Sequence, residues 1–259
     1  MKRVVIIGSG NLAEALARAV AKSGLELVQI FARNAERARI IAELTATDWA
    51  THPGMLAQDA DIYLIAVSDK AVEHVAATLP IPEGAAVAHT AGSVPLAAIP
   101  EKFARRAVFY PMQTFTKGRE VDFSVIPVFL ETPSAELRPE LEAFARQLSG
   151  TVIWATSEQR ARVHLAAVFA CNFVNHMYAV GEGIVRSAGL PFDVLKPLLA
   201  ETAAKALDAA SPADVQTGPA VRNDLPTMAR HRALLAAAPR LENIYSIISN
   251  NIWEISKKI

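Results

Sequence analysis

Residues 3–16, RVVIIGSGNLAEAL, decide the fold of the N-terminal half of the chain. The apolar run 3–7 predicts a buried strand, and apolar side chains at helical spacing predict a helix over 11–22. The turn between them, residues 8–13, matches the pattern G-x-G-x-x-G/A. A strand, a glycine turn of this pattern and a helix, in this order, are typical of dinucleotide-binding units.

The small residues of this turn each have a physical purpose. Gly8 permits a tight turn, Gly10 lets a diphosphate approach the backbone, and Ala13 lets the helix pack closely on the strand. The helix N-terminus adds unpaired N–H groups and a partial positive charge. The alternative is a glycine turn that binds no ligand. We predict that the diphosphate of a dinucleotide binds at Gly8, Ser9, Gly10, Asn11 and Leu12.

The second predicted strand, 27–32, is followed by Arg33 and Asn34. An NAD-binding unit places an acidic residue there for the ribose 2′-hydroxyl, and this chain has none. Arg33 can instead bind a 2′-phosphate through charge-assisted hydrogen bonds, and Arg37 follows one turn later. Alternatively, Asn34 only caps the next helix and Arg33 is a solvated charge. We predict that Arg33 and Asn34 contact the cofactor, and that NADP(H) is favoured over NAD(H).

Strands and helices alternate as far as residue 154, which predicts a doubly wound, mostly parallel sheet of the α/β class. Further strands are expected at 46–49, 61–67, 85–89, 108–110 and 125–130. From Ser157 onward the periodicity is helical, with helices expected at 158–188, 192–209, 225–237 and 240–257. The sequence therefore predicts a nucleotide-binding domain over 1–155 and an all-helical substrate and dimerisation domain over 156–259.

Composition and charge narrow the range of partners. The 259 residues include 26 basic and 26 acidic side chains, which argues against a nucleic-acid or membrane-surface partner. Cys171 is the single cysteine and the N-terminus lacks the pattern of a signal peptide, so a cytoplasmic location is expected.

The run 163–181 holds no Asp, Glu, Lys or Arg and is nearly as long as a membrane span of about 20 residues. Its histidines and asparagines favour a buried core helix instead. A helix that is apolar almost all round is hard to cover within a small helical domain, which predicts a homodimer. Burial within one subunit is the open alternative.

Polar residues follow two neighbouring strands of the predicted sheet. Val67 and Ser68 close the strand 61–67, while His89, Thr90 and Ser93 close the next. The carboxyl edge of such a sheet is where a nicotinamide binds, so Val67, Ser68 and Thr90 are expected at the cofactor and Ser93 at the substrate. His89 could donate a proton, or be a structural histidine. For Ser68 the alternative is helix capping, and for Thr90 and Ser93 turn formation.

The long predicted helix carries a second group of candidates. His164, Cys171, Asn175 and Glu182 are spaced near whole helical turns and should share one face, with Asn172 beside them. His164 with Asn172 or Asn175 could supply a proton donor and an electrostatic stabiliser. The alternative is a buried hydrogen-bond network between helices or subunits.

Two further residues are candidates for substrate binding. Gln113 is expected to face the cleft, and Arg222 could anchor a substrate carboxylate, unless it forms an interface ion pair. Asp224 reads as a helix N-cap. The six histidines are scattered without metal-ligand spacing, so no metal site is expected.

Several segments resemble known families. GSGNLAEAL at 8–16 resembles the opening of pyrroline-5-carboxylate reductases, ketopantoate reductases and β-hydroxyacid dehydrogenases. HTAGS at 89–93, YPMQTF at 110–115, HLAAVFACNFVNHMYA at 164–179 and QTGPAVRND at 216–224 resemble a bacterial family that joins a Rossmann-like domain to a C-terminal domain of unknown function. Its members are often labelled deazaflavin-type NADP oxidoreductases.

The resemblance implies a Rossmann domain followed by an all-α domain of the 6-phosphogluconate-dehydrogenase-like type. It also implies an NADP-dependent oxidoreductase, with nicotinamide or a deazaflavin left open as the second redox partner. β-Hydroxyacid dehydrogenases and ketopantoate reductases carry a lysine four residues before an asparagine on the corresponding helix. In this chain the residue four positions before Asn172 is Val168, and the one four positions before Asn175 is Cys171, so neither is a lysine. We expect the chain to reduce a small carbonyl or imine substrate with NADP(H); the alternative is a non-catalytic NADP(H)-binding sensor or regulatory protein.

Overall fold

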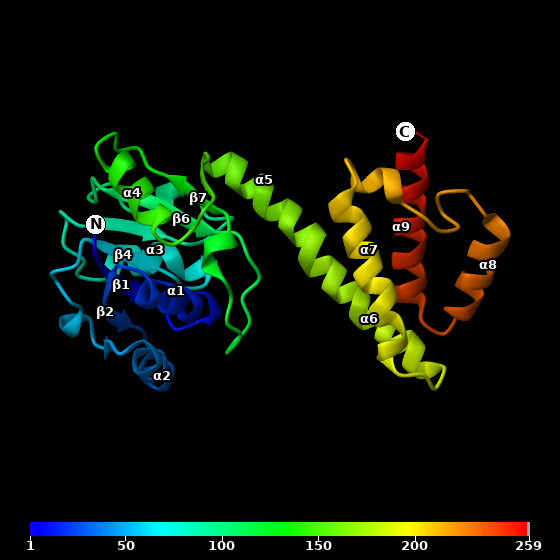
Figure 1. Ribbon diagram of the computed structural model, residues 1–259, viewed down its shortest axis with the longest axis horizontal. Coiled ribbons are helices and arrows are strands. Elements are labelled where there is room, and N and C mark those ends of the chain that lie inside the picture. The colour runs from blue at the N-terminus through cyan, green and yellow to red at the C-terminus, as the bar shows by residue number, and fades with distance from the viewer. Residues whose placement is uncertain (258–259) are drawn as a thin grey trace. The chain divides into compact units, whose positions relative to one another are not determined.

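Eight strands of the described chain, residues 1–257, form one sheet in the order β3-β2-β1-β4-β5-β6-β7-β8 in the computed structural model (Figure 1). The strands are β1 (Arg3–Ile7), β2 (Glu26–Phe31), β3 (Asp48–Ala50), β4 (Ile62–Ile65), β5 (Ala86–His89), β6 (Arg106–Pro111), β7 (Val128–Glu131) and β8 (Val152–Trp154). Neighbouring strands are parallel except β6 and β7. The predicted Rossmann-type, mostly parallel sheet is confirmed.

Helices cover both faces of the sheet because its strands are apolar on both sides. Val4 and Ile6 of β1 pack with α1 (Asn11–Lys22), α2 (Ala35–Thr45) and α4 (Leu137–Arg146). Val5 and Ile7 pack on the opposite face with α3 (Val72–Thr78). Short 3-10 helices complete the connections: η1 (Pro53–Met55), η2 (Asp69–Ala71), η3 (Leu96–Ala98), η4 (Phe123–Val125), η6 (Phe192–Leu195) and η7 (Pro212–Val215).

The predicted strands and helices are present within a few residues of their expected bounds. Helices α3 and α4 and the short strand β8 were not predicted from the sequence. At seven residues, α3 is too short for helical periodicity to stand out. The pattern was visible in α4, where Leu137, Leu141 and Phe144 recur at i, i+4 and i+7 and are all buried.

One continuous helix runs over Ser157–Ser187, comprising α5 (Ser157–Ala167), the π-helical segment η5 (Val168–Phe173) and α6 (Val174–Ser187). By length and composition alone it could cross a membrane, although a single helix of this kind is weak evidence because core helices share these properties. The expectation of a buried core helix is wrong for the single chain. Leu165, Phe169 and Phe173 are 56%, 62% and 49% exposed.

The π-helical segment also changes which residues share a face. The predicted stripe of His164, Cys171, Asn175 and Glu182 assumed an uninterrupted α-helix. A π turn takes up one extra residue, which at 3.6 residues per turn rotates the following side chains by about 100°. His164 precedes the segment and Asn175 follows it, so they no longer lie on one stripe.

The chain divides into two compact units, 1–176 and 177 onward, instead of at the expected boundary 155/156. The first unit gains the start of the long helix because Arg160 and His164 bond to residues around the sheet. The second unit holds the end of α6 with α7 (Lys196–Asp208), α8 (Leu225–Leu234) and α9 (Pro239–Ser256). It is all-helical, as expected; residues 258 and 259 of the predicted domain lie outside the described residues.

Candidate functional site

A cavity of about 640 Å³ opens beside the glycine turn at the carboxyl ends of β1, β2 and β4. All the predicted cofactor residues except Thr90 line it: Gly8, Ser9, Gly10, Asn11, Leu12, Arg33, Asn34, Val67 and Ser68. The other residues that line this cavity were not predicted from the sequence. They include Thr51 and Pro53 after β3 and His74, Val75 and Thr78 of α3.

The two glycines of the turn have different reasons to be glycine. Gly8 has φ +139°, and a Cβ there would lie 2.1 Å from the Ala66 carbonyl oxygen, so the backbone of β1 passes directly against β4. Among the described residues, a Cβ on Gly10 would meet no atom within 4 Å, and no side chain caps α1 at this position. The first N–H groups of α1 therefore face open space, and the cradle fits a diphosphate.

Arg33 and Arg37 differ in their availability. Asn34 accepts a hydrogen bond from the Arg37 N–H at 3.0 Å and so caps α2, which is the helix-capping alternative given above for Asn34. The Arg37 guanidinium donates to Glu14 at 2.7 Å. Burial acts to raise the pKa of Glu14, but hydrogen bonds from Arg37 and Arg18 outweigh it and lower the pKa. Arg37 is thus engaged within the fold, whereas Arg33 is exposed on the cavity wall.

A second polar group lies beyond the carboxyl ends of β5 and β6. The Tyr110 hydroxyl is 3.1 Å from His164 Nδ1, and their rings meet edge to face. We call these two residues the Tyr110–His164 pair. A Cβ on Gly92 would lie 2.5 Å from His164 Nδ1 and 2.7 Å from Tyr110 Cζ, so the turn after β5 rests on the pair. Burial raises the pKa of Tyr110, which keeps the phenol protonated at neutral pH.

Consecutive residues connect the cavity to this pair. Ser68 lines the cavity, and the next residue, Asp69, accepts a short hydrogen bond from Ser93. Gly92, which precedes Ser93, contacts the Tyr110–His164 pair. Sequence analysis predicted Ser68, Ser93 and His164 here but not Tyr110.

Two predicted residues near the strand ends are engaged within the fold. Thr90 is buried and donates its hydroxyl to the Ile65 carbonyl at 3.2 Å, so it does not line the cavity. His89 is fully buried; its Nδ1 accepts from the Ala91 N–H and its Nε2 donates to the Pro95 carbonyl, both at 3.3 Å. Burial is the main cause that lowers the pKa of His89 to about 4. This geometry favours the structural alternative over a proton donor.

The remaining candidates have no recorded contact with the Tyr110–His164 pair among the described residues. Asn172 and Asn175 are exposed beyond the start of the π-helical segment. The Gln113 side chain accepts hydrogen bonds from the adjacent Thr114. Arg222 is exposed in the second unit, where Asp224 caps α8 through the Thr227 N–H at 3.1 Å. Within residues 1–257, no group of His, Cys, Asp and Glu could hold a metal ion.

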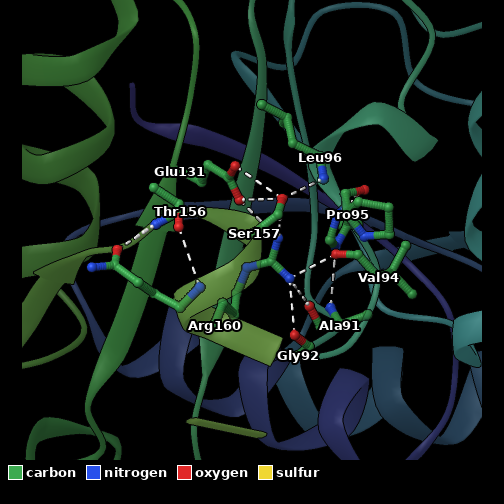
Figure 2. A network of polar contacts seen from close by, with 11 residues as sticks. Ala91, Gly92, Val94, Pro95, Leu96, Glu131, Thr156, Ser157 and Arg160 are labelled. Carbon is green, nitrogen blue, oxygen red and sulfur yellow. Dashed lines mark hydrogen bonds and ion pairs between the residues drawn. The ribbon is translucent and has the colours of Figure 1, made fainter. Parts of the chain in front are cut away.

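A partly buried ion pair that was not predicted from the sequence lies behind the turn after β5 (Figure 2). Arg160 of α5 is fully buried and donates to Glu131 of β7 at 2.8 Å. Ser157 joins both, donating to Glu131 at 2.8 Å and accepting from Arg160 at 3.1 Å. The signal for Arg160 is weak, because an arginine in the first turns of a helix usually reads as a solvated charge.

The arrangement can combine nucleotide binding with proton donation. The N–H groups of α1 and the Arg33 guanidinium suit phosphates, and the Tyr110–His164 pair offers a phenol hydroxyl hydrogen-bonded to an imidazole. A protonated phenol next to an imidazole is a competent general acid. These two functions are those required to add a hydride and a proton to a double bond.

The comparisons agree with this arrangement. Residues 3–90 match the family "NADP oxidoreductase coenzyme F420-dependent", and residues 126–252 match a domain of unknown function, DUF2520. A structure from Bacteroides fragilis described as a "putative NADP oxidoreductase" is 40% identical, with 98% of each chain covered and a TM-score of 0.90. No curated protein sequence matches the chain.

More distant structures share the fold. An imine reductase from Myxococcus stipitatus in complex with NADP+ is 15% identical, covers 99% of this chain and 93% of its own, and has a TM-score of 0.65. A 1-pyrroline-5-carboxylate reductase from Streptococcus pyogenes is 16% identical, with 99% and 98% covered and a TM-score of 0.63. The chain therefore belongs to the family of NADP oxidoreductases that join a Rossmann domain of the coenzyme F420-dependent type to a DUF2520 helical domain.

Proposed function

We propose that this oxidoreductase uses NADPH to reduce the C=O or C=N bond of a small molecule. The observation that carries the proposal is the continuity from the glycine-turn cavity, through Ser68, Asp69 and Ser93, to the Tyr110–His164 pair. The imine reductase and the pyrroline-5-carboxylate reductase among the similar folds support a carbonyl or imine as the acceptor.

NADP(H) is preferred to NAD(H) in this proposal because of Arg33. It is exposed on the cavity wall after β2, and no acidic residue stands there to bind a ribose 2′-hydroxyl. Asn34 is committed to capping α2 through its side chain. A guanidinium can bind a 2′-phosphate through two parallel hydrogen bonds, which a 2′-hydroxyl cannot match.

The bound nucleotide supplies the hydride, and the chain must supply the proton. Tyr110 keeps its proton because burial raises its pKa, and its hydroxyl lies against His164 Nδ1. When the imidazole holds the Nδ1 proton, it donates to the Tyr110 oxygen and the phenol can donate its own proton outward. His164 then passes the Nδ1 proton to the phenolate oxygen while its Nε2 takes up a proton from water, so that the imidazole stays neutral. Ser93 is held by Asp69 and directly follows Gly92, so its hydroxyl can orient the substrate.

The protein is further proposed to act as a homodimer in the cytoplasm. Several apolar side chains on helices of each unit are largely exposed, including Phe169 at 62%, Leu198 at 61% and Leu207 at 85%. Exposed apolar surface of this extent favours an interface with a second copy. Sedimentation at decreasing protein concentration tests it; a monomer at all concentrations contradicts the dimer.

A thermal-shift comparison of NADPH, NADP+, NADH and NAD+ tests the cofactor. A ligand that binds only the native state stabilises it by about 2.7 kcal/mol at a hundredfold excess over Kd, so NADPH should raise the Tm most. Oxidation of NADPH is then followed with cyclic imines, 2-keto acids and semialdehydes. Turnover supports a reductase. Tight binding without turnover supports the sensor instead, and no shift with any nucleotide contradicts both.

A further inference from the structure

The guanidinium of Arg160 holds the turn that follows β5. Its Nη1 donates to the carbonyl oxygens of Ala91, Gly92 and Val94 at 3.1, 2.9 and 2.6 Å (Figure 2). Its Nη2 donates to Glu131 and to Ser157. One side chain of α5 thus joins the turn, strand β7 and the start of its own helix.

The surroundings of Arg160 show that the geometry of its guanidinium, and not its charge alone, matters for these contacts. Arg160 is fully buried, and its Nε has no hydrogen-bond partner among residues 1–257. Burial of a charge is costly, and an ion pair such as Arg160–Glu131 adds little net stability over apolar packing. What the guanidinium adds is a rigid, planar set of donors that reaches three carbonyls and a carboxylate together, which an ammonium cannot do.

The same turn packs directly against the Tyr110–His164 pair. His164 follows Arg160 by four residues within α5, so both side chains leave the same side of the helix. Gly92, whose carbonyl oxygen Arg160 binds, is so close that an added Cβ would lie 2.5 Å from His164 Nδ1. A shift of the turn by a fraction of an ångström therefore changes the space left for the imidazole.

We propose that Arg160 is a positioning residue, which fixes the Gly92 turn against the Tyr110–His164 pair and thereby sets the hydrogen bond of the proton donor. Ser157 supports it from the other side, where its hydroxyl also accepts the Leu96 N–H at 3.0 Å. The catalytic part of this inference rests on the proposed reductase function; the geometric part does not.

The test uses Arg160→Lys, Arg160→Met and the double variant Arg160→Met/Glu131→Gln, which removes both charges of the ion pair. Arg162→Met is the matched control, because Arg162 lies half a turn away, is 79% exposed and pairs with Glu158 on the surface. The direct readout is the ¹⁵N signal of His164 Nδ1 in histidine-labelled protein, assigned through its loss in His164→Gln. It reports the hydrogen bond to Tyr110 without a substrate.

Arg160→Lys and the double variant should fold, bind NADPH within about twofold of the native Kd, and show a shifted His164 Nδ1 signal. Their kcat/KM should fall about 100-fold, as small misplacements of a catalytic group do, whereas Arg162→Met should match the native protein in every measurement. A native His164 signal in folded Arg160→Lys would overturn the proposal, because the positive charge alone would then suffice. If the native protein reduces no substrate, the proposed function fails while the His164 signal still decides the role of Arg160.

Discussion

Replacing Gly10 with valine should separate nucleotide binding from folding. Gly10 has φ −77°, which any residue adopts, and a Cβ there meets no atom within 4 Å. Gly10→Val should therefore change the free energy of unfolding by no more than about 1 kcal/mol. Hydrogen bonds to a charged group contribute about 1.5–3 kcal/mol each, so losing two costs at least about 3 kcal/mol. The Kd for NADPH should rise more than about 100-fold, at about 1.4 kcal/mol per factor of ten.

Gly8→Ala is the contrasting variant, because its Cβ would lie 2.1 Å from the Ala66 carbonyl oxygen at φ +139°. It should lower the free energy of unfolding by at least about 2 kcal/mol through strain and overpacking. Urea denaturation measures stability, and titration of NADPH fluorescence measures Kd. Native affinity in Gly10→Val would refute the assignment of the diphosphate to this turn. Native stability in Gly8→Ala would refute the account of its close approach to β4.

Three further predictions follow from the site. Arg33→Ser should weaken NADPH binding by about tenfold or more, since one charge-assisted contact is lost, and leave the affinity for NADH within about twofold of the native value. Arg37→Ser is the control. Equal losses of affinity for both nucleotides in Arg33→Ser would contradict the phosphate contact. His164→Ala and Tyr110→Phe should keep the NADPH affinity and lower kcat by about 100-fold, as measured with a substrate from the panel, and unchanged turnover would remove them as proton donors. The pKa of His89 is lowered from 6.5 to about 4, so its contribution to stability is complete above pH 6.5 and is lost as the pH falls to 4, by about 3 kcal/mol. Urea unfolding of the native protein and His89→Asn at pH 7 and 4 should differ by this amount, and parallel curves would show that His89 titrates normally in the folded state.

The sequence was sufficient to predict most of the fold of the first unit, residues 1–176, which holds the glycine turn. The bounds of β1 and α1 and the residues lining the cavity around Gly10 agree with the structure, since they depend on neighbouring residues. The absence of an acidic residue after β2 also pointed to Arg33, which the structure places on the cavity wall. The prediction from the sequence was wrong about the long helix, whose exposed face in the single chain cannot be distinguished from a core helix by apolar composition.

Of the Tyr110–His164 pair, only one residue was predicted from the sequence. His164 was a candidate because a histidine stood out in an apolar run, but Tyr110 looked like an ordinary strand residue. The predicted partners Asn172 and Asn175 were chosen on the assumption of a regular α-helix. The π-helical segment after Ala167 moves them off the face of His164.

By itself, the sequence determined the nucleotide-binding turn and most of the strands and helices, because periodicity and backbone freedom are properties of adjacent residues. The tertiary structure alone decided which distant residues meet. Tyr110 and His164 are 54 positions apart, and Arg160 binds the carbonyl of Gly92 across 68. Such contacts depend on how helix faces pack on a twisted sheet, and a local pattern carries no record of that packing.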